Sequence, residues 1–361
     1  MLLLPDFNAQ HCVRYRYSYS ECSRCADVCP HDAIHLFDAG VELLADACQS
    51  CALCVGACPT EALTDRGVSA ENILKLADSK KMMTVACTPS GAGGDVIVSC
   101  LGAINSVVLA EISRRGVALE FFGTNQCSQC VHASKGPDMI RLNLEAREIL
   151  CGLEETKEWA TLTNQGIQQS TSGNDGHDAT RRGLFRSIIE HGRSIADGEF
   201  EAPTAPLKAI RAAAVFLPQR RKLLTGLYDE LGEHPLRVAR HPSIPAEDWS
   251  IAEGCTNCEA CVRVCPTGAL QLLENNAAWR IVLLNERCVA CGVCAEACQP
   301  GVLRLRAEAY TLINKQKARL LRGVSKQRCT RCDRVFATED GTTICPICSG
   351  DDTDFASIFG S

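Results

Sequence analysis

The chain has 361 residues, of which 25 are cysteine, and this share is several times that of an ordinary soluble protein. Because 46% of the residues are hydrophobic and 22% are charged, there is ample material for packed cores, which excludes wholesale disorder. The 37 basic and 43 acidic residues give a formal net charge of −6. This balance argues against nucleic acid as a main partner, since phosphate binding requires a clustered basic surface.

The N-terminal residues, MLLLPDFNAQHC, lack a basic segment followed by a long apolar stretch, so no secretory signal is predicted. No run approaches the roughly 18 apolar residues that a bilayer-spanning helix needs, and no direct membrane insertion is expected. We therefore expect a cytoplasmic protein, in which thiols stay reduced. In that compartment, dense cysteines indicate metal ligands rather than disulfides.

Residues 10–66 contain one complete and one incomplete cysteine motif. The complete motif has the spacing C-x2-C-x2-C-x3-C and consists of Cys48, Cys51, Cys54 and Cys58. The incomplete motif consists of Cys22, Cys25 and Cys29. Tyr19 stands at its first position, and the nearest thiol upstream is Cys12. Between the two motifs, AIHLF and VELL flank the turn residues DAG and predict a hairpin.

Residues 80–153 predict a small α/β domain, because short apolar strands alternate with helical patterns. Strands are expected at MMTVAC, DVIVSC and VALEFF, and helices at AINSVVLAEISRRG and PDMIRLNLEAREIL. Four cysteines follow the strand ends, where sites of α/β domains usually lie. This middle set consists of Cys87, Cys100, Cys127 and Cys130.

Residues 154–180 are polar and rich in Ser, Thr, Gly, Asn and Gln, which predicts a flexible linker. Residues 181–249 predict a helical connector with one helix around Leu184–Ala196 and another around Leu207–Leu231. We expect both helices to pack against the second cysteine-rich segment or against a partner.

Residues 250–306 repeat the organisation of residues 10–66. Both motifs are complete here: Cys255, Cys258, Cys261 and Cys265, then Cys288, Cys291, Cys294 and Cys298. ALQLLE and WRIVLL, with the turn residues Asn275 and Asn276 between them, predict the hairpin between the two motifs.

Residues 325–352 predict a zinc ribbon. The ribbon set, Cys329, Cys332, Cys345 and Cys348, has the spacing C-x2-C-x12-C-x2-C. Two such knuckles supply four thiolates for tetrahedral zinc. The segment CPIC resembles the second knuckle of rubredoxins, so a single redox-active iron is the alternative.

A [4Fe-4S] cluster requires four soft, negatively charged ligands around one small body. In the complete motif three thiolates face one cluster and the fourth points to the neighbouring cluster, so the predicted ligand sets cross between motifs. Set I is Cys12, Cys22, Cys25 and Cys58; set II is Cys48, Cys51, Cys54 and Cys29. Set III is Cys255, Cys258, Cys261 and Cys298; set IV is Cys288, Cys291, Cys294 and Cys265. Zinc or buried free thiols are the alternative interpretation.

Both cysteine-rich segments resemble bacterial-type 2[4Fe-4S] ferredoxins, through CSRCADVCPHDAI with CQSCALCVGACPTEAL and CTNCEACVRVCPTGAL with CVACGVCAEACQPGVL. The resemblance implies ferredoxin-like modules whose clusters pass one electron at a time. Two departures stand out: Gln299 separates Cys298 from Pro300, and nine residues separate Cys12 from Cys22. Either Cys12 completes the first cluster, or that cluster is incomplete, as in ferredoxins with [3Fe-4S]; His11 is a further candidate ligand.

The middle domain resembles, more loosely, the small iron-sulfur subunit of methyl-viologen-reducing hydrogenases, through VSCLGAI and GTNQCSQC. This resemblance implies a [2Fe-2S] cluster held by the middle set, and the spacing is also similar to that of thioredoxin-like [2Fe-2S] ferredoxins. A redox-active dithiol of Cys127 and Cys130 and a second zinc site remain alternatives.

We therefore predict an α+β multidomain chain: two ferredoxin-like 2[4Fe-4S] modules, a small α/β middle domain and a C-terminal zinc ribbon. The pattern C-x3-C-x2-C, a G-x-G-x-x-G loop and a G-x4-G-K loop are all missing from the sequence. The sequence thus favours a non-catalytic electron-transfer subunit or carrier that serves redox partner proteins of an oxidoreductase complex. The alternative is a redox-sensing or interaction protein that uses labile clusters and the ribbon to switch partners.

Overall fold

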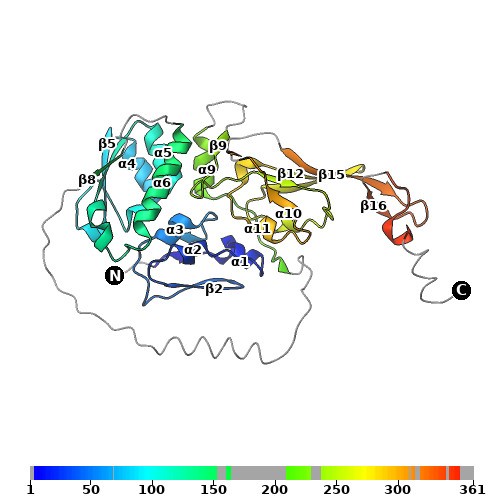
Figure 1. Cartoon of the computed structure of the whole chain (residues 1–361), viewed down its shortest axis with the longest axis horizontal. Coiled ribbons are helices and arrows are strands. Elements are labelled where there is room, and N and C mark those ends of the chain that lie inside the picture. The colour runs from blue at the N-terminus through cyan, green and yellow to red at the C-terminus, as the bar shows by residue number, and fades with distance from the viewer. Residues whose placement is uncertain are drawn as a thin grey trace, which may run out of the picture.

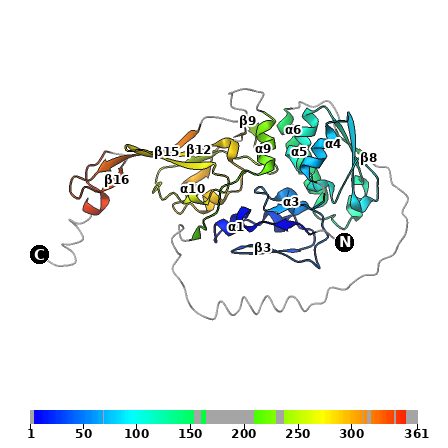
Figure 2. The same cartoon turned by 180° about the vertical axis from the view of Figure 1, so that it is seen from behind.

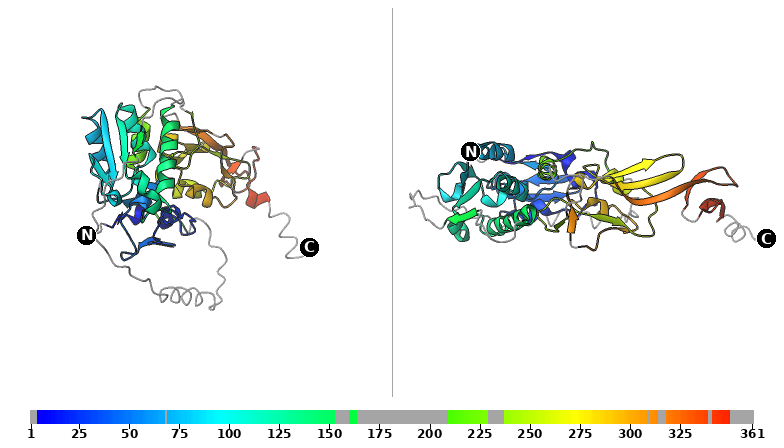
Figure 3. Two further views of the ribbon diagram at one scale, coloured as in Figure 1. Left: turned by 60° about the vertical axis from the view of Figure 1, so that its left-hand side comes forward. Right: turned by 90° about the horizontal axis from the view of Figure 1, so that it is seen from above.

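The computed structural model describes residues 4–67, 69–152, 160–163, 209–228, 237–308, 310–313, 318–338 and 341–349. The middle domain and the second module lie side by side above the first module, and the ribbon projects from the far side of the second module (Figures 1 and 2). Seen from above, the ribbon extends away from all three (Figure 3). The two modules contact each other directly.

The first module is built from short elements around its two cysteine motifs. They are β1 (Asp6–Phe7), the 3-10 helix η1 (Ala9–His11), α1 (Val13–Arg16), α2 (Arg24–Asp27), β2 (Ile34–Phe37), β3 (Gly40–Leu43), α3 (Leu53–Ala57) and β4 (Leu63–Thr64). The predicted hairpin is confirmed, because β2 pairs antiparallel with β3. Strand β1 pairs with β4 and so joins the two ends of the module.

The middle domain contains a parallel sheet covered by helices. Its elements are α4 (Ala70–Ala77), β5 (Met82–Cys87), η2 (Thr88–Ser90), β6 (Val96–Val98), η3 (Leu101–Ala103), α5 (Ser106–Arg114), β7 (Ala118–Phe122), η4 (Thr124–Gln129), α6 (Gly136–Cys151) and β8 (Ala160–Thr163). The strand order is β6-β5-β7-β8, and all three pairings are parallel. The strands and helices expected from the sequence are therefore confirmed.

Local signals explain where the helices of this domain begin and end. The side chain of Asn105 caps α5 by accepting hydrogen bonds from the backbone N–H groups of Val107 and Val108. Gly116, at φ +73°, ends the following turn in the left-handed conformation that glycine tolerates best. Within α6 the buried Asn143 amide donates to the carbonyl oxygens of Gly102 and Ile104 at 3.1 and 3.0 Å, and so holds η3 in place.

Two predicted segments differ in the structure. The expected linker contains a strand: β8 lies within it and extends the sheet beside β7, because the ATLT sequence supplies β-branched residues next to an open sheet edge. The rest of the linker and the helix expected around Leu184–Ala196 lie outside the described residues. In the described part of the expected helix around Leu207–Leu231, the structure has α9 (Gln219–Gly226). Residues 211–218 form no regular helix, and α9 begins after Pro218 because a residue before proline avoids the helical conformation.

The second module repeats the first and adds strands. Its elements are β9 (Arg237–Ala239), β10 (Trp249–Ile251), α10 (Ala260–Val264), β11 (Leu270–Glu274), β12 (Ala278–Leu283), η6 (Asn285–Arg287), α11 (Val293–Glu296), β13 (Leu303–Leu305) and β14 (Tyr310–Leu312). The predicted hairpin is confirmed by the pairing of β11 with β12. Strand β10 pairs with β13, as β1 does with β4.

One long strand carries the ribbon. Strand β15 (Arg319–Arg328) pairs with β12 along most of its length and with β16 (Val335–Thr338) at its far end. The sheet order β11-β12-β15-β16 is therefore continuous from the second module into the ribbon. Because one strand belongs to both, the ribbon is attached to the module through backbone hydrogen bonds.

The domains share hydrophobic cores. Val13 and Tyr17 of the first module are buried in the core of the second. Helix α9 joins the middle domain to the second module, because Leu224 and Leu227 pack with residues of α5, α6 and β9. These shared cores fix how the cysteine sets lie relative to one another.

The contact between the first module and the middle domain yields a prediction at Gly56 in α3. A Cβ atom added there would lie 2.9 Å from the Ala103 carbonyl oxygen. Overpacking of about 1–3 kcal/mol outweighs the gain of roughly 0.5–1 kcal/mol for replacing a helical glycine. We expect Gly56→Ala to lower the unfolding temperature and to speed hydrogen exchange in α3 and η3. Gly93→Ala, where a Cβ meets nothing within 4 Å, is the control, and equal behaviour of the two variants would contradict this contact.

Candidate metal centres

The three complete motifs share one loop conformation. In each, the residues on both sides of the second cysteine have positive φ: Ser50 and Ala52, Asn257 and Glu259, and Ala290 and Gly292. Two left-handed residues within one short loop curl the chain tightly, which lets cysteines three apart converge. All 25 cysteines are free thiols.

Set I comes together although its first cysteine lies outside the repeated spacing. Cys12, Cys22, Cys25 and Cys58 line one small cavity. Cys12 follows the 3-10 helix η1 with φ −72° and ψ 131°, and Cys288 follows η6 with φ −71° and ψ 131°. Cys12 therefore takes the backbone position that the first cysteine of a complete motif takes in the second module.

The two other candidates for this position lie elsewhere. Tyr19 is 51% exposed, with its ring against that of Tyr17. The His11 ring stacks on Phe216 at a centroid distance of 3.6 Å. The loop itself departs from the shared conformation, since Ser23 has φ −123°.

The members of the other three sets are also mutual neighbours. Burial raises the pKa of Cys54 most, and its neighbouring thiols raise it further; these are Cys51, Cys25, Cys29 and Cys48. Burial and the thiols of Cys298, Cys255 and Cys258 raise the pKa of Cys261 to about 12. All four members of set IV line one cavity. The cysteines of each predicted set therefore lie close together.

The size of the sets distinguishes clusters from single ions. Among the described residues, only the ribbon set has ligand atoms that all lie within 4.8 Å of one another. Sets I to IV are wider, which suits a multi-atom cluster with thiolates at its corners better than one tetrahedral zinc ion. The donor sets of four soft thiols therefore fit [4Fe-4S].

The fourth cysteine of three of the four motifs receives a backbone hydrogen bond. The N–H groups of Ala33 and Ala62 donate to the sulfurs of Cys29 and Cys58, both at 3.3 Å. For Cys298 the donor is Leu303, five residues later instead of four, at 3.4 Å. The extra residue Gln299 therefore shifts the donor by one position and preserves the interaction.

The five thiol sets lie in one series. Cys261 of set III lies close enough to Cys294 of set IV to raise its pKa, and Cys25 of set I does the same to Cys54 of set II. Sets IV and I meet where Cys22 packs against the core of the second module. At the other end, Cys51 of set II and Cys100 share a buried cluster. The middle set thus lies at the end of the series beside set II, and not between the two modules.

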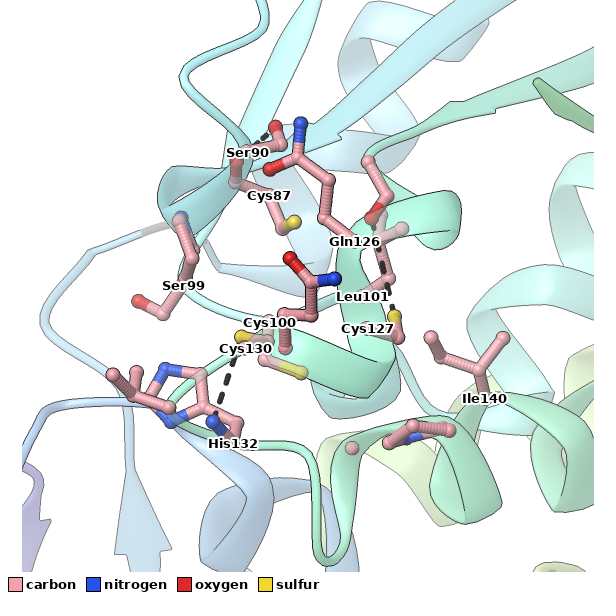
Figure 4. A pocket seen from close by; sticks show the side chains of 16 residues that line it. Cys87, Ser90, Ser99, Cys100, Leu101, Gln126, Cys127, Cys130, His132 and Ile140 are labelled. Atoms are coloured by element: carbon pink, nitrogen blue, oxygen red, sulfur yellow. Dashed lines mark hydrogen bonds between the residues drawn. The ribbon is translucent and has the colours of Figure 1, made fainter. Parts of the chain in front are cut away.

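The middle set surrounds a cavity of about 320 Å³ at the carboxyl ends of β5, β6 and β7. Figure 4 shows Cys87, Cys100, Cys127 and Cys130 around a common space. Burial raises the pKa of Cys100 to about 12, and the neighbouring Cys51, Cys87 and Cys130 contribute to the increase. Ligation would thus have to displace protons from buried thiols, which a positive metal centre favours.

A histidine pair links this cavity to the first module. Nε2 of His31 lies 2.9 Å from Nδ1 of His132. Burial lowers the pKa of both imidazoles, so one neutral ring donates to the other. His132 is buried and lines the cavity, whereas His31 follows Cys29 and Pro30.

In the ribbon, the sulfurs of Cys332 and Cys345 are 3.8 Å apart. Four ligands at about 2.3 Å from a tetrahedral ion would have nearly this separation. The Cys345 N–H donates to the sulfur of Cys329 at 3.3 Å, which lowers the pKa of Cys329 to about 6. The ribbon set can therefore hold one metal ion.

Four arginines lie beside sets I and IV: Arg16, Arg24, Arg220 and Arg221. Sequence reasoning did not single them out. Arg16 and Arg221 are 1% and 0% exposed. The Nη1 of Arg221 has no hydrogen-bond partner among the described residues. A buried cation is costly unless an anionic group compensates it. The carboxylate of Glu286 is a charged neighbour of Arg221, and a bound cluster with four thiolates, of charge about −2 when oxidised, would add negative charge there. Nothing in the spacing of these arginines could have predicted their placement.

Two family models, both described as a 4Fe-4S dicluster domain, match residues 20–62 and 254–303. The first match begins after Cys12, and the second contains all of sets III and IV. The chain therefore contains two 4Fe-4S dicluster domains, which define an iron-sulfur protein of the electron-transfer class. No curated protein and no solved structure is significantly similar to it. Within the described residues, no helix is long and apolar enough to cross a membrane.

The geometry of the middle cavity predicts the effect of substituting Gly123. This residue has φ +99°, and an added Cβ would lie 2.4 Å from the Cβ of Ser90 and 3.0 Å from the Cys87 sulfur. We expect Gly123→Ala to displace Cys87, to lower the metal content of the purified protein and to make Cys87 reactive toward alkylation. Metal analysis and mass spectrometry of alkylated peptides would detect this.

Gly152→Ala is the matched control, because Gly152 also has positive φ but an added Cβ meets nothing within 4 Å. If both variants kept the same metal content and the same Cys87 reactivity, Cys87 would not be a ligand.

Proposed function

We propose that this protein passes single electrons through several [4Fe-4S] clusters between redox partner proteins, as a subunit or dedicated carrier of an oxidoreductase complex. The single observation that carries the proposal is the unbroken series of thiol sets, III, IV, I, II and the middle set, across two modules that share a core. When bound, a [4Fe-4S] cluster accepts and returns one electron at low potential.

Each set would contribute four thiolates to one cluster, and Cys12 would serve as the first ligand of set I. Its support is the cavity that it lines with Cys22, Cys25 and Cys58, together with its backbone match to Cys288. The N–H groups that donate to the fourth cysteines would stabilise the more negative, reduced state of the clusters.

The middle set would hold a [2Fe-2S] cluster. The support is its four buried or half-buried thiols around one cavity. These thiols lie too far apart to bind one metal ion together. This site would exchange electrons with a partner, because it lies at the end of the series and its mouth carries the 66% exposed Val131.

The ribbon set would hold structural zinc. Its sulfurs are close enough for one ion, and a d¹⁰ ion adds stability without redox chemistry.

The ribbon extends from the second module on β15. Its exposed Ile344 and Ile347 would offer a docking surface on the side of the second module, which holds sets III and IV. We expect the protein to work in the cytoplasm, where the ligand thiols stay reduced.

The cofactor assignment predicts the metal content of anaerobically purified protein. Four cubanes, one [2Fe-2S] cluster and one ribbon site correspond to about sixteen plus two irons and one zinc. We expect Cys12→Ala to lower the iron content and to produce the EPR signal of an oxidised [3Fe-4S] cluster. Cys151→Ala, outside every set, is the control. Fewer than about eight irons in the unmodified protein would contradict the presence of two dicluster modules.

Electron transfer itself is tested by repeated reduction and oxidation under anaerobic conditions. A carrier should be reduced by a low-potential donor and reoxidised by an artificial acceptor over many cycles without loss of iron, as followed by EPR and iron analysis. The alternative, a redox sensor with labile clusters, predicts that oxidation releases iron and changes the affinity for a partner. Iron loss within the first cycles would favour this alternative.

A further inference from the structure

The middle cavity is larger than a cluster by itself requires. Its volume is about 320 Å³, whereas the cavities lined by set I and by set IV have volumes of about 30 and 20 Å³. Sets I and IV fit four-iron clusters, so a smaller [2Fe-2S] cluster needs no more space than they provide. The middle cavity therefore has room for a second group beside its cluster. Sites for small molecules in proteins have volumes of about 300 Å³ and more.

The position and the walls of this cavity suit an organic ligand. It lies at the carboxyl ends of β5, β6 and β7, where open α/β sheets commonly bind ligands. Leu101 and Ile140 form buried apolar walls, with 4% and 9% of their surfaces exposed, and Pro89 and Pro137 add to these walls. A ligand with an apolar ring or chain would bury that part here.

Two polar side chains of the lining have no hydrogen-bond partner among the described residues. They belong to Gln126, in η4, and to Ser99, which directly follows β6. Both residues are half-buried, and Figure 4 shows them among the side chains that surround the cavity. The Gln126 amide offers both a donor and an acceptor, and polar groups withdrawn from water normally have partners. A ligand with a complementary polar group would supply them.

The charges around the cavity indicate which ligands it can take. None of the described residues that line it is Asp, Glu, Lys or Arg. Apart from the middle set, its titratable side chain is His132, whose Nδ1 lies 2.9 Å from Nε2 of His31. Lys135 and Asp138 flank the lining residues 136 and 137 but are exposed and do not line the cavity. A carboxylate or phosphate would lose its hydration here without gaining a cation, and thiolates would repel it.

We propose that the middle cavity binds a small organic amide or carbonyl compound without negative charge, beside the middle set. The polar group of this compound would hydrogen-bond to Gln126, and its apolar part would lie against Leu101 and Ile140. The inference rests on the proposed function, since it names the chemical class of a partner at that end of the series. The middle set would then face a small molecule inside the chain, at the end of the series opposite to set III.

Benzamide and benzoate serve as probes, because they share one ring and nearly one shape and differ in charge. Calorimetry on the anaerobically purified full chain measures their affinities. We expect benzamide to bind, and benzoate to bind at least about tenfold more weakly, because the anion loses its hydration without gaining a cation. Proton NMR of benzamide then locates the site, because a reduced, paramagnetic cluster in the middle set should broaden the lines of a ligand bound beside it.

A variant tests the assigned contact. Gln126→Leu removes the amide and keeps much of the side-chain volume. We expect it to weaken benzamide binding roughly two- to tenfold, the usual contribution of a neutral hydrogen bond, at unchanged iron content. Gln327→Leu is the matched control, because Gln327 is also half-buried but lies on β15, the strand that carries the ribbon.

The proposal is overturned if benzamide does not bind, if benzoate binds as tightly, or if Gln126→Leu with full iron content binds benzamide as tightly as the unmodified protein. Binding without line broadening, in reduced protein of full iron content, would place benzamide elsewhere and would also overturn it. Failure of the proposed function would look different, because the unmodified protein would then contain too little iron or fail to cycle reversibly, whereas calorimetry measures the affinity for benzamide without any redox step.

Discussion

The structure depends on the burial of thiols in groups of four. As thiolates they repel one another, and as thiols burial raises their pKa, to about 12 for Cys25, Cys100 and Cys261. A positively charged metal centre bound by such a set would displace the protons and offset the repulsion between the thiolates. Metal binding and folding would then be coupled, and the small elements of each module would serve chiefly to hold loops around these centres.

The packing of the modules converts separate sites into one series. Val13 and Tyr17 insert into the core of the second module, and α9 joins that module to the middle domain. Because these contacts are cores rather than flexible linkers, set I faces set IV and the middle set faces set II. The same helix brings Arg220 and Arg221 into the interface, so the element that fixes the arrangement also supplies its buried charge.

The sequence predicted much of the fold because its signals are local. Cysteine spacings, the two hairpins and the alternating strands and helices of the middle domain depend on residues close together in the chain, and all of these are observed. The irregular run before α9 and the strand β8 were missed. A short polar segment such as ATLT becomes a strand only because β7 offers it an open edge, and this edge is invisible in a local pattern.

By itself, then, the sequence determined which cysteines are grouped in each motif and that the chain has two dicluster domains. It could do so because thiolate spacing is a direct constraint of cluster geometry. Only the tertiary structure decided the order of the groups. It also decided the approach of Cys12 to its set across nine intervening residues, and the meeting of four arginines between the modules. These features rest on contacts between segments as many as 266 residues apart, which are fixed by the packing of whole cores and not by any local pattern.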